Sequence, residues 1–393
     1  MEALELHNFT WWNPTIVFFG EGTIPKLAEQ LSAIRARSVL LLYGGGAVFK
    51  SGAYAQVTEA LTRAGIEFPE VGGVLPNPRV DKVREAIARI KAVPVDAIVP
   101  IGGGSVFDSA KAVAAGACYD GDVWDFFEKK AEVQKALPIF GVLTASATSS
   151  EVNDIAVVSN PESEFKTSIS SPLLFPKVSV IDPTLQFTLP ERQTVNGGVD
   201  IMAHVLERVL DGDEGAELMD EQGYALLRSM MRLIPDLIEN PKDYDARAEY
   251  AWAASIAHSG FLSCGRNGRG DFASHKLGHA LSLLFDVPHG ASLSVMMPAW
   301  ARYLHEDYPV PFARLAENVF DIYDGTDEDK ALEGIESLED FFGSIGAPTT
   351  LRELNVREED VRRLAENASS HGSFGKLKRL NEEDVLEIYK LAY

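Results

Sequence analysis

Short apolar runs alternate with longer amphipathic stretches in the first half of the chain. Continuous apolar runs of about four to eight residues are typical of strands buried in a parallel sheet, whereas apolar residues spaced three and four apart indicate helices. This pattern predicts strands at residues 38–43, 68–71, 96–101, 137–144 and 178–181. The stretches between them predict helices at residues 23–31, 54–64, 80–91 and 106–117. Such alternation indicates a parallel α/β sheet with a ligand site at the carboxyl ends of its strands.

After Pro190 the strand-like runs give way to helical periodicity. Helices are predicted at residues 199–210, 219–239, 245–262, 274–284, 292–304, 312–322, 328–345, 358–366 and 382–391. Because 393 residues exceed one ordinary domain, we expect two. Their expected limits are residues 1–187 for the α/β domain and residues 188–393 for an all-helical domain.

The N-terminal segment FTWWNPTIVFF, residues 9–19, is rich in aromatic and β-branched side chains. It predicts one or two strands near a sheet edge or a subunit contact. An exposed aromatic edge strand needs a cover, and dimerisation is one way to provide it.

Charge and composition narrow the class of protein. The chain has 36 basic and 58 acidic residues, a net charge of -22, so nucleic acid and anionic membranes are unfavourable partners. Its two cysteines, Cys118 and Cys264, form no Cys-x-x-Cys motif, which fits a reducing compartment. No signal peptide and no apolar run of about 18 residues is apparent. We therefore expect a cytoplasmic protein that acts on small molecules.

Two glycine-rich turns follow predicted buried strands, and neither matches Gly-x-Gly-x-x-Gly. In GGGSVFDSAK the backbone amides of Gly102, Gly103, Gly104 and Ser105 open a helix, where they can bind the pyrophosphate of a dinucleotide. Asp108, one turn further, either reaches the cofactor or caps the helix. The alternative is a tight turn in which glycine serves only the backbone geometry.

The first turn contains Gly44, Gly45 and Gly46, followed by Ala47, and has no acidic residue. NAD-specific sites usually place Asp or Glu there to bind the ribose 2′-hydroxyl. With Lys50 downstream, a 2′-phosphate meets no repulsion, so the sequence favours NADP(H), with NAD(H) also possible.

Three of the eight histidines lie in HKLGHALSLLFDVPH. His275 and His279 are four residues apart in an apolar pattern, which puts them on one helix face, and Pro288 places His289 on a following loop. Asp200 and His204 have the same spacing upstream. One carboxylate and up to three imidazoles suit a divalent ion such as Zn²⁺ or Fe²⁺. The alternative is a set of satisfied polar residues on helix faces.

The motifs FTWWNPTIVFFGEG, GGGSVFDSAK, LTASATSSEVN, NGGVDIMAH and HKLGHALSLLFDVPHG together resemble the iron-containing (group III) alcohol dehydrogenase family, in particular its butanol dehydrogenase and aldehyde reductase branch. The resemblance implies a dehydroquinate synthase-like fold, with a Rossmann-like NAD(P)-binding domain before a helical metal-binding domain, and a homodimer. It assigns the metal ligands to Asp200, His204, His275 and His289, and puts His279 near the nicotinamide.

The resemblance also assigns cofactor contacts and a substrate pocket. The cofactor contacts fall on Gly44, Gly45, Gly46, Asn77, Gly102, Gly103, Gly104, Ser105, Asp108, Thr144, Thr148 and Lys166. Ala47 departs from the serine common in NADP-using relatives. Candidates for the substrate pocket are Asn153, Phe261 and Cys264.

The expected activity is reversible hydride transfer between a nicotinamide and short-to-medium primary alcohols or aldehydes, with Fe²⁺ or Zn²⁺ as the metal. Two alternatives share the fold: a glycerol dehydrogenase-like enzyme, and a dehydroquinate synthase-like lyase whose substrate requires basic residues, for which Arg266 and Arg269 are the only close pair near the metal motif. A third alternative is a non-catalytic nucleotide- or metal-binding protein.

Overall fold

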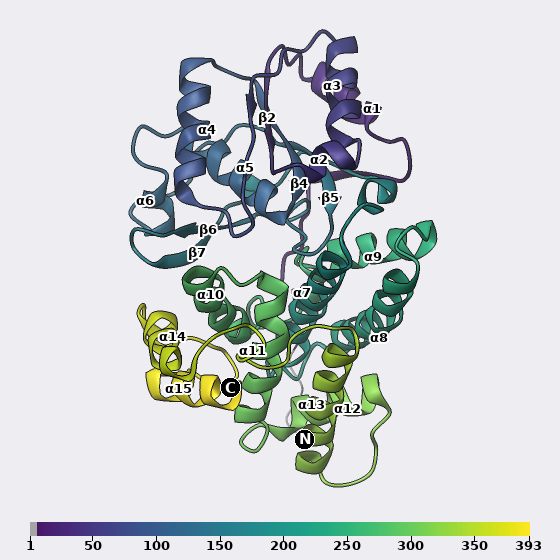
Figure 1. Ribbon diagram of the computed structural model, residues 1–393, viewed down its shortest axis with the longest axis vertical. Helices are drawn as coiled ribbons and strands as arrows, with labels where there is room; N and C mark the ends of the chain where they lie inside the picture. Colours follow the sequence, from purple (N-terminus) through teal and green to yellow (C-terminus); the bar gives the residue numbers. More distant parts are fainter. Residues whose placement is uncertain (1–5) are drawn as a thin grey trace. The chain divides into compact units, whose positions relative to one another are not determined.

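The computed structural model describes residues 6–393. The chain forms two compact units (Figure 1). One unit, the α/β unit, contains residues 12–190 and 240–255; the other, the helical unit, contains residues 191–239 and 256–393 together with the described N-terminal residues up to Trp11. The predicted division at residue 187 does not describe the two units fully, because residues 240–255 return to the α/β unit. There Ala251 is buried against Phe107, Leu143 and Ile181.

The α/β unit is built on a six-stranded parallel sheet with the order β1-β8-β5-β4-β2-β3. Its strands are β1 (Ile16–Phe19), β2 (Val39–Tyr43), β3 (Glu70–Val71), β4 (Ala97–Gly103), β5 (Phe140–Ala145) and β8 (Val178–Ile181). Each strand predicted from an apolar run is present. The aromatic N-terminal segment supplies the edge strand β1, which begins only at Ile16.

Helices cover both faces of this sheet (Figure 1). Leu40 and Leu42 point to one face, and Leu41 and Val99 to the other. The helices are α1 (Pro25–Ala33), α2 (Ala47–Lys50), α3 (Ala53–Arg63), α4 (Val80–Ala92), α5 (Gly104–Gly116) and α6 (Trp124–Phe127), with 3₁₀ turns at Pro172–Leu174 and Pro183–Gln186. Burial on both faces explains the continuous apolar runs of the strands.

One element of this unit was missed by the sequence reasoning. Strands β6 (Ile155–Asn160) and β7 (Phe165–Ser170) form a separate antiparallel hairpin. Ala156 and Val158 are buried, but the sequence offers only a four-residue apolar run in β6 (IAVVSN), and β7 (FKTSIS) is mostly polar. The hairpin carries Lys166 and is therefore part of the candidate cofactor region.

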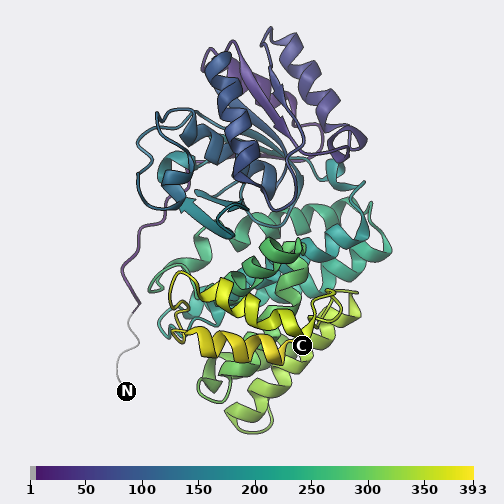
Figure 2. The same cartoon turned by 60° about the vertical axis from the view of Figure 1, so that its left-hand side comes forward.

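The helical unit contains α7 (Glu191–Val209), α8 (Glu217–Glu239), α10 (Ala273–Phe285), α11 (His289–Leu304), α12 (Pro309–Phe320), α13 (Asp327–Ser344), α14 (Val361–Ser369) and α15 (Glu382–Leu391), with 3₁₀ turns at Phe261–Ser263 and Glu358–Asp360. Helix α7 packs against α8, α10 and α11. The C-terminal helices α14 and α15 pack against α10 and α11 (Figure 2).

Among the helix boundaries that differ from the predictions, three lie in or next to the helices of the site. Helix α7 begins at Glu191 rather than at residue 199, so it extends through Gly197 and Gly198. Helix α9 (Tyr244–Ala257) ends before His258, and the chain then turns at Gly260, where φ is 89°. Helix α11 begins at His289 rather than at residue 292. The boundary of α11 falls on His289, a histidine of the site described below.

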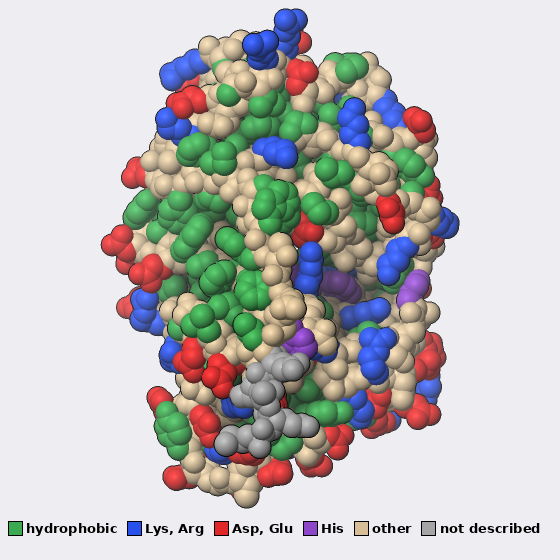
Figure 3. All heavy atoms as spheres, turned by 180° about the vertical axis from the view of Figure 1, so that it is seen from behind, with side chains coloured by type: hydrophobic (Ala, Val, Ile, Leu, Met, Phe, Trp, Pro, Cys, Tyr) green, Lys and Arg blue, Asp and Glu red, His purple; other side chains and the backbone are tan. Residues whose placement is uncertain are grey.

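On the face in Figure 3, hydrophobic side chains gather in a broad area on the left at mid-height, and acidic and basic side chains both occur around it. Among the described residues, no helix combines the length and the apolar composition needed to cross a bilayer.

Candidate active site

Helices α7 and α10 bring a carboxylate and two imidazoles together. Asp200 and His204 lie one turn apart on α7, and the Asp200 Oδ1 atom is 3.5 Å from His204 Nδ1. His275, in the first turn of α10, places its Nε2 atom 3.8 Å from the same oxygen. The Asp200 side chain is only 4% exposed. The spacing of four residues on α7 therefore does bring both side chains to one buried position.

A third imidazole arrives from α11. His289 Nε2 lies 3.6 Å from Asp200 Oδ1. The prediction that His289 lies on a loop is wrong, because Pro288 is the N-cap residue and His289 begins α11. Helices α11 and α7 approach so closely here that a Cβ atom on Gly290 would lie 1.9 Å from the main-chain oxygen of Asn196. A glycine at position 290 is thus required to bring His289 beside Asp200.

This donor set fits a divalent ion. Asp200, His275 and His289 offer ligand atoms that all lie within 4.8 Å of one another. Ligands about 2.1 Å from a tetrahedral ion are about 3.4 Å apart, close to the observed separations. His204 stands beside this trio rather than within it, with Nδ1 facing the carboxylate. Burial lowers the pKa of His204 well below its usual value, which keeps the imidazole neutral, as a ligand must be.

The sequence reasoning missed Glu207, which supports His275 from behind. Glu207 is fully buried, and its Oε1 atom accepts hydrogen bonds from His275 Nδ1 (2.8 Å) and from Ser274 Oγ (2.6 Å). Burial raises the pKa of Glu207 to about 7. This contact leaves His275 Nε2 directed at Asp200, and carboxylates often orient metal-binding histidines in this way. A signal was available, since residues 200, 204 and 207 share one face of a helix.

His279 lies next to the three-residue cluster. Its ring centre is 5.5 Å from that of His289, and the two rings are tilted by 39°. His279 is half-buried and is not among the residues whose ligand atoms converge with Asp200. Its assignment to the nicotinamide rather than to the metal stays a prediction.

The two glycine turns of the α/β unit differ in the space around their glycines. Cβ atoms added at Gly45 and Gly46 would meet nothing within 4 Å, and neither residue has a positive φ. By contrast, a Cβ at Gly102 would lie 2.4 Å from Val106, and one at Gly104 would lie 2.3 Å from Thr148. Packing therefore explains the second turn, whereas the first keeps an open backbone surface that a ligand can approach.

Three further predicted cofactor contacts, Asn77, Asp108 and Lys166, have side-chain hydrogen bonds within the α/β unit. Lys166 Nζ donates to Asn77 Oδ1 at 2.9 Å, so these two predicted contacts lie together. Asp108 is buried, and its oxygens accept from Ser150 Oγ (2.6 Å) and from the main-chain nitrogen of Val157 (3.2 Å). These contacts link α5 to Ser150 and to strand β6, and the expected contact of Asp108 with the cofactor stays a prediction.

The remaining predicted residues have varied surroundings. Ser105, in the first turn of α5, is partly exposed and accepts through its main-chain oxygen from Ser109. Thr144 is partly exposed at the carboxyl end of β5. Asn153 is buried and accepts a 2.7 Å hydrogen bond from Lys111.

Two candidates for the substrate pocket belong to the helical unit. Phe261 packs edge-on against Trp11, with ring centres 6.1 Å apart. Cys264 is half-buried, and burial raises the pKa of its thiol.

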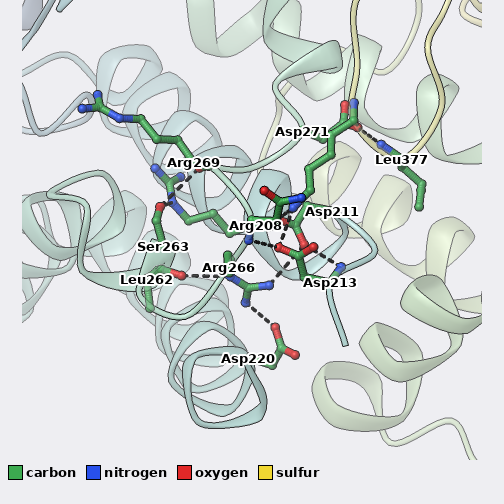
Figure 4. A network of polar contacts seen from close by, with 12 residues as sticks. Arg208, Asp211, Asp213, Asp220, Leu262, Ser263, Arg266, Arg269, Asp271 and Leu377 are labelled. Atoms are coloured by element: carbon green, nitrogen blue, oxygen red, sulfur yellow. Dashed lines mark hydrogen bonds and ion pairs between the residues drawn. The ribbon is translucent and has the colours of Figure 1, made fainter. Parts of the chain in front are cut away.

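Arg266 has a structural role. Its guanidinium is fully buried and forms ion pairs with Asp211 and Asp220 (Figure 4). It also donates to the main-chain oxygen of Leu262 at 2.9 Å. The partners of Arg266 thus lie within the protein, which removes half of the basic pair that a lyase of phosphorylated substrates would use.

Comparison with known proteins agrees with this architecture. The family described as "Iron-containing alcohol dehydrogenase" matches residues 14–183, and "Fe-containing alcohol dehydrogenase family, C-terminal" matches residues 194–393. The chain belongs to the iron-containing alcohol dehydrogenase family and is therefore an enzyme of this class.

Individual relatives cover nearly the whole chain. It is 42% identical to the "Probable NADH-dependent butanol dehydrogenase 1" of Bacillus subtilis, over 98% of this chain and 99% of the relative. It is 32% identical to the "NADPH-dependent aldehyde reductase YqhD" of Escherichia coli, over 93% and 94%. The crystal structure of NADH-dependent butanol dehydrogenase A from Thermotoga maritima superposes with a TM-score of 0.96 at 45% identity, covering 99% of this chain and all of that one. The predicted fold class, a Rossmann-like domain with a helical domain, is confirmed.

Proposed function

We propose that this protein is a metal-dependent dehydrogenase that moves a hydride between a nicotinamide and short-to-medium primary alcohols or aldehydes. One observation carries the metal dependence. Imidazole nitrogens of His204, His275 and His289 lie 3.5 Å, 3.8 Å and 3.6 Å from a single buried oxygen of Asp200. The names of the relatives, butanol dehydrogenase and aldehyde reductase, support this substrate class.

Each residue has a distinct task in this proposal. Asp200, His275 and His289, with His204 as the fourth ligand, hold Fe²⁺ or Zn²⁺. When bound, such an ion supplies Lewis acidity that polarises the oxygen of an alcohol or aldehyde. Glu207 fixes the ring of His275, and His279, next to His289, relays the proton with water.

The glycine turns hold the cofactor. Open backbone at Gly45 and Gly46 permits close approach of a phosphate, and the amides that open α5 provide donors for a pyrophosphate. The cofactor itself carries the redox chemistry, so the α/β unit needs only to bind and orient it.

The first turn accepts NADP(H) in this proposal, with NAD(H) as a second cofactor. The turn itself carries no acidic residue, which favours NADP(H). Two observations favour NAD(H) instead. Relatives at 42%, 40% and 39% identity are named NADH-dependent. Glu70, distant in sequence, also accepts hydrogen bonds from Tyr43 (2.8 Å) and Tyr54 (2.7 Å) at the end of β2, which brings one carboxylate near the turn.

We also infer a cytoplasmic homodimer. Strand β1 is an edge of the sheet, Ile16 is 50% exposed, and Trp12 is 57% exposed just before it. Pairing with a second copy would cover this edge. Light scattering of the purified protein tests the dimer directly: a single monomer mass at micromolar concentration contradicts it.

The activity test is butanal reduction followed at the nicotinamide absorbance band. NADPH and NADH are compared on chelator-treated protein with Fe²⁺ or Zn²⁺ restored. Metal-dependent oxidation of the cofactor supports the proposal, and a preference for NADH removes the NADP(H) part alone. Full turnover without metal contradicts the metal centre. Cofactor binding without net turnover on any alcohol or aldehyde favours the lyase or the non-catalytic alternative.

A further inference from the structure

A fully buried lysine lies on the helix that follows the second glycine turn. Lys111, on α5, is 0% exposed. Its Nζ atom donates to Ser150 Oγ at 2.9 Å, to Asn153 Oδ1 at 2.7 Å and to the main-chain oxygen of Ile155 at 2.8 Å. An ammonium group has three N–H donors, so each one has an acceptor. All three acceptors lie in the β5–β6 loop, residues 146–154, or at the first residue of β6.

Asp108 holds the same part of the chain from the same face of α5. Its carboxylate accepts from Ser150 Oγ at 2.6 Å and from the main-chain nitrogen of Val157 at 3.2 Å. Because the one hydroxyl hydrogen of Ser150 goes to Asp108, the lone pairs of that oxygen are free to accept from Lys111. Ser150 thus bridges a buried carboxylate and a buried ammonium, and burial of these charges is tolerated because both are hydrogen-bonded.

The two side chains that Lys111 holds also hold Thr148. The main-chain nitrogen of Ser150 donates to Thr148 Oγ1 at 3.2 Å, and Asn153 Nδ2 donates to the main-chain oxygen of Thr148 at 3.3 Å. Thr148 in turn packs on the second glycine turn, since a Cβ atom added at Gly104 would lie 2.3 Å from Thr148 Oγ1. A continuous set of contacts therefore joins Lys111 to the backbone that opens α5.

We propose that Lys111 is a positioning residue for the nicotinamide cofactor, because it fixes Thr148 beside the second glycine turn through Ser150 and Asn153. This inference rests on the proposed function, in which the amides of that turn bind the pyrophosphate, and it adds a residue that does not touch the cofactor. Thr148 is partly exposed, so a shift of its side chain changes the surface that the cofactor meets. Small displacements of such a surface are enough to weaken binding.

The arrangement requires the charged form of Lys111. A neutral amine has only two N–H donors, so one of the three acceptors would lose its partner. Burial lowers the pKa of Lys111 to about 8, although Asp108 on α5 and Glu151 and Asp154 in the β5–β6 loop all act to raise it. The fully hydrogen-bonded loop is therefore expected below pH 8 and is lost as the pH rises above it.

The first experiment is fluorescence titration of the full-length protein with NADH and with NADPH. Lys111→Met keeps an unbranched side chain but removes the donors, and the Kd of the preferred cofactor is expected to rise by about tenfold or more. The affinity for Zn²⁺ should stay unchanged, because the candidate metal ligands belong to the helical unit. In butanal reduction, KM for the cofactor should rise while kcat at saturating cofactor changes by less than about threefold.

A matched control separates positioning from general loss of stability. Leu61, on α3, is a fully buried core residue of the same unit, so Leu61→Ala should lower the unfolding free energy without moving the β5–β6 loop. Its cofactor affinity is expected to equal that of the wild type. Equal weakening of cofactor binding in Leu61→Ala and Lys111→Met would assign the effect to instability and overturn the inference.

The pH profile of cofactor binding gives a readout that does not depend on a variant. The Kd of the wild type should rise about tenfold between pH 7 and pH 9, because the fraction of protein with charged Lys111 falls by that factor. Lys111→Met should show no such rise. If Lys111→Met does not fold, the wild-type profile decides together with Ser150→Ala, which removes the bridge and should weaken binding by about threefold. A flat wild-type profile overturns the inference.

The outcomes also separate this inference from the proposed function. If the wild type binds a cofactor and Lys111→Met binds it equally well, the positioning role fails and the proposed function stands. If kcat falls in Lys111→Met while cofactor affinity is kept, Lys111 acts on the reaction in another way and the inference is again wrong. If the wild type binds neither NADH nor NADPH, the proposed function fails, and the positioning role fails with it.

Discussion

The metal-ligand cluster is built from side chains, whereas the glycine turns offer mainly backbone atoms to a ligand. In the helical unit, side chains from α7, α10 and α11 converge on one oxygen of Asp200, and each is held by packing or by hydrogen bonds. In the α/β unit, the turn at Gly45 and Gly46 presents bare backbone. A site made of side chains loses its function when one donor changes, whereas a site made of backbone tolerates change until a side chain blocks the approach.

The largest effect is expected from Asp200→Asn. An amide cannot supply the negative charge around which the three imidazoles gather, so metal binding should fail and kcat/KM should fall by about a thousandfold or more. Binding of NADPH or NADH, measured by fluorescence titration, should stay within about twofold because the cofactor turns lie in the other unit. Loss of cofactor binding together with the metal would mean that the two regions are not functionally separate.

Glu207→Gln should have a smaller effect on the same centre. The amide can still contact His275 but no longer strengthens it as a ligand, and loss of such a partner typically lowers metal affinity by about 10- to 100-fold. Competition with a coloured chelator measures the affinity. Glu221, an exposed glutamate on α8, provides the matched control in Glu221→Gln, which should bind metal like the wild type. Equal affinity in Glu207→Gln would show that the contact seen here does not support the metal.

Two glycine substitutions compare the regions directly. In Gly290→Ala the new methyl group overlaps the main chain of Asn196, so the free energy of unfolding should fall by about 2 kcal/mol or more and His289 should be displaced. In Gly45→Ala the methyl group meets no protein atom, so stability should be unchanged while cofactor binding weakens. Chemical denaturation and cofactor titration on both variants test the contrast. Unaltered cofactor binding in Gly45→Ala would contradict the assignment of the first turn.

The smallest expected effect is on the pH dependence of stability, with opposite signs in the two units. Burial raises the pKa of Asp271 to about 6, so its stabilising contribution is complete below the unfolded value near 3.8 and is lost as the pH rises through 6. Burial lowers the pKa of Lys111 to about 8, so its contribution is present above the unfolded value near 10.5 and is lost as the pH falls through 8.

The test compares unfolding free energies of the wild type with those of Asp271→Asn and Lys111→Met across pH. The wild type should lose stability relative to Asp271→Asn between about pH 4 and 6. Relative to Lys111→Met it should gain stability between about pH 8 and 10. If the unfolding free energies of the wild type and a variant change with pH in the same way, the pKa shift of the replaced residue is contradicted.

Much of this fold could be predicted from the sequence, and the reason is local. Buried strands of a two-faced sheet require continuous apolar runs, and these were recognised at residues 38–43 and 96–101. The pair Asp200 and His204 was recognised because four residues are about one helical turn. The hairpin at residues 155–170 was missed because the apolar run of its first strand is only four residues long and its second strand is mostly polar.

The candidate site was predictable only in part. The ligand types followed from motif spacing, and the ligand set followed from the family resemblance. Glu207 shares a helix face with Asp200 and His204, but its contact with His275 joins segments far apart in the chain. Asp108 was assigned to the cofactor by the family resemblance, and its hydrogen bonds to Ser150 and to the backbone of Val157 appear only in the folded chain.

The sequence by itself indicated the buried strands and most helices, the glycines of the first turn and the donors available for a metal. The tertiary structure decided which donors meet. His289 reaches Asp200 because Gly290 lets α11 approach Asn196. Spacing within one helix is fixed by its backbone geometry, whereas contact between helices depends on side-chain volumes along the whole interface. No local pattern contains that information.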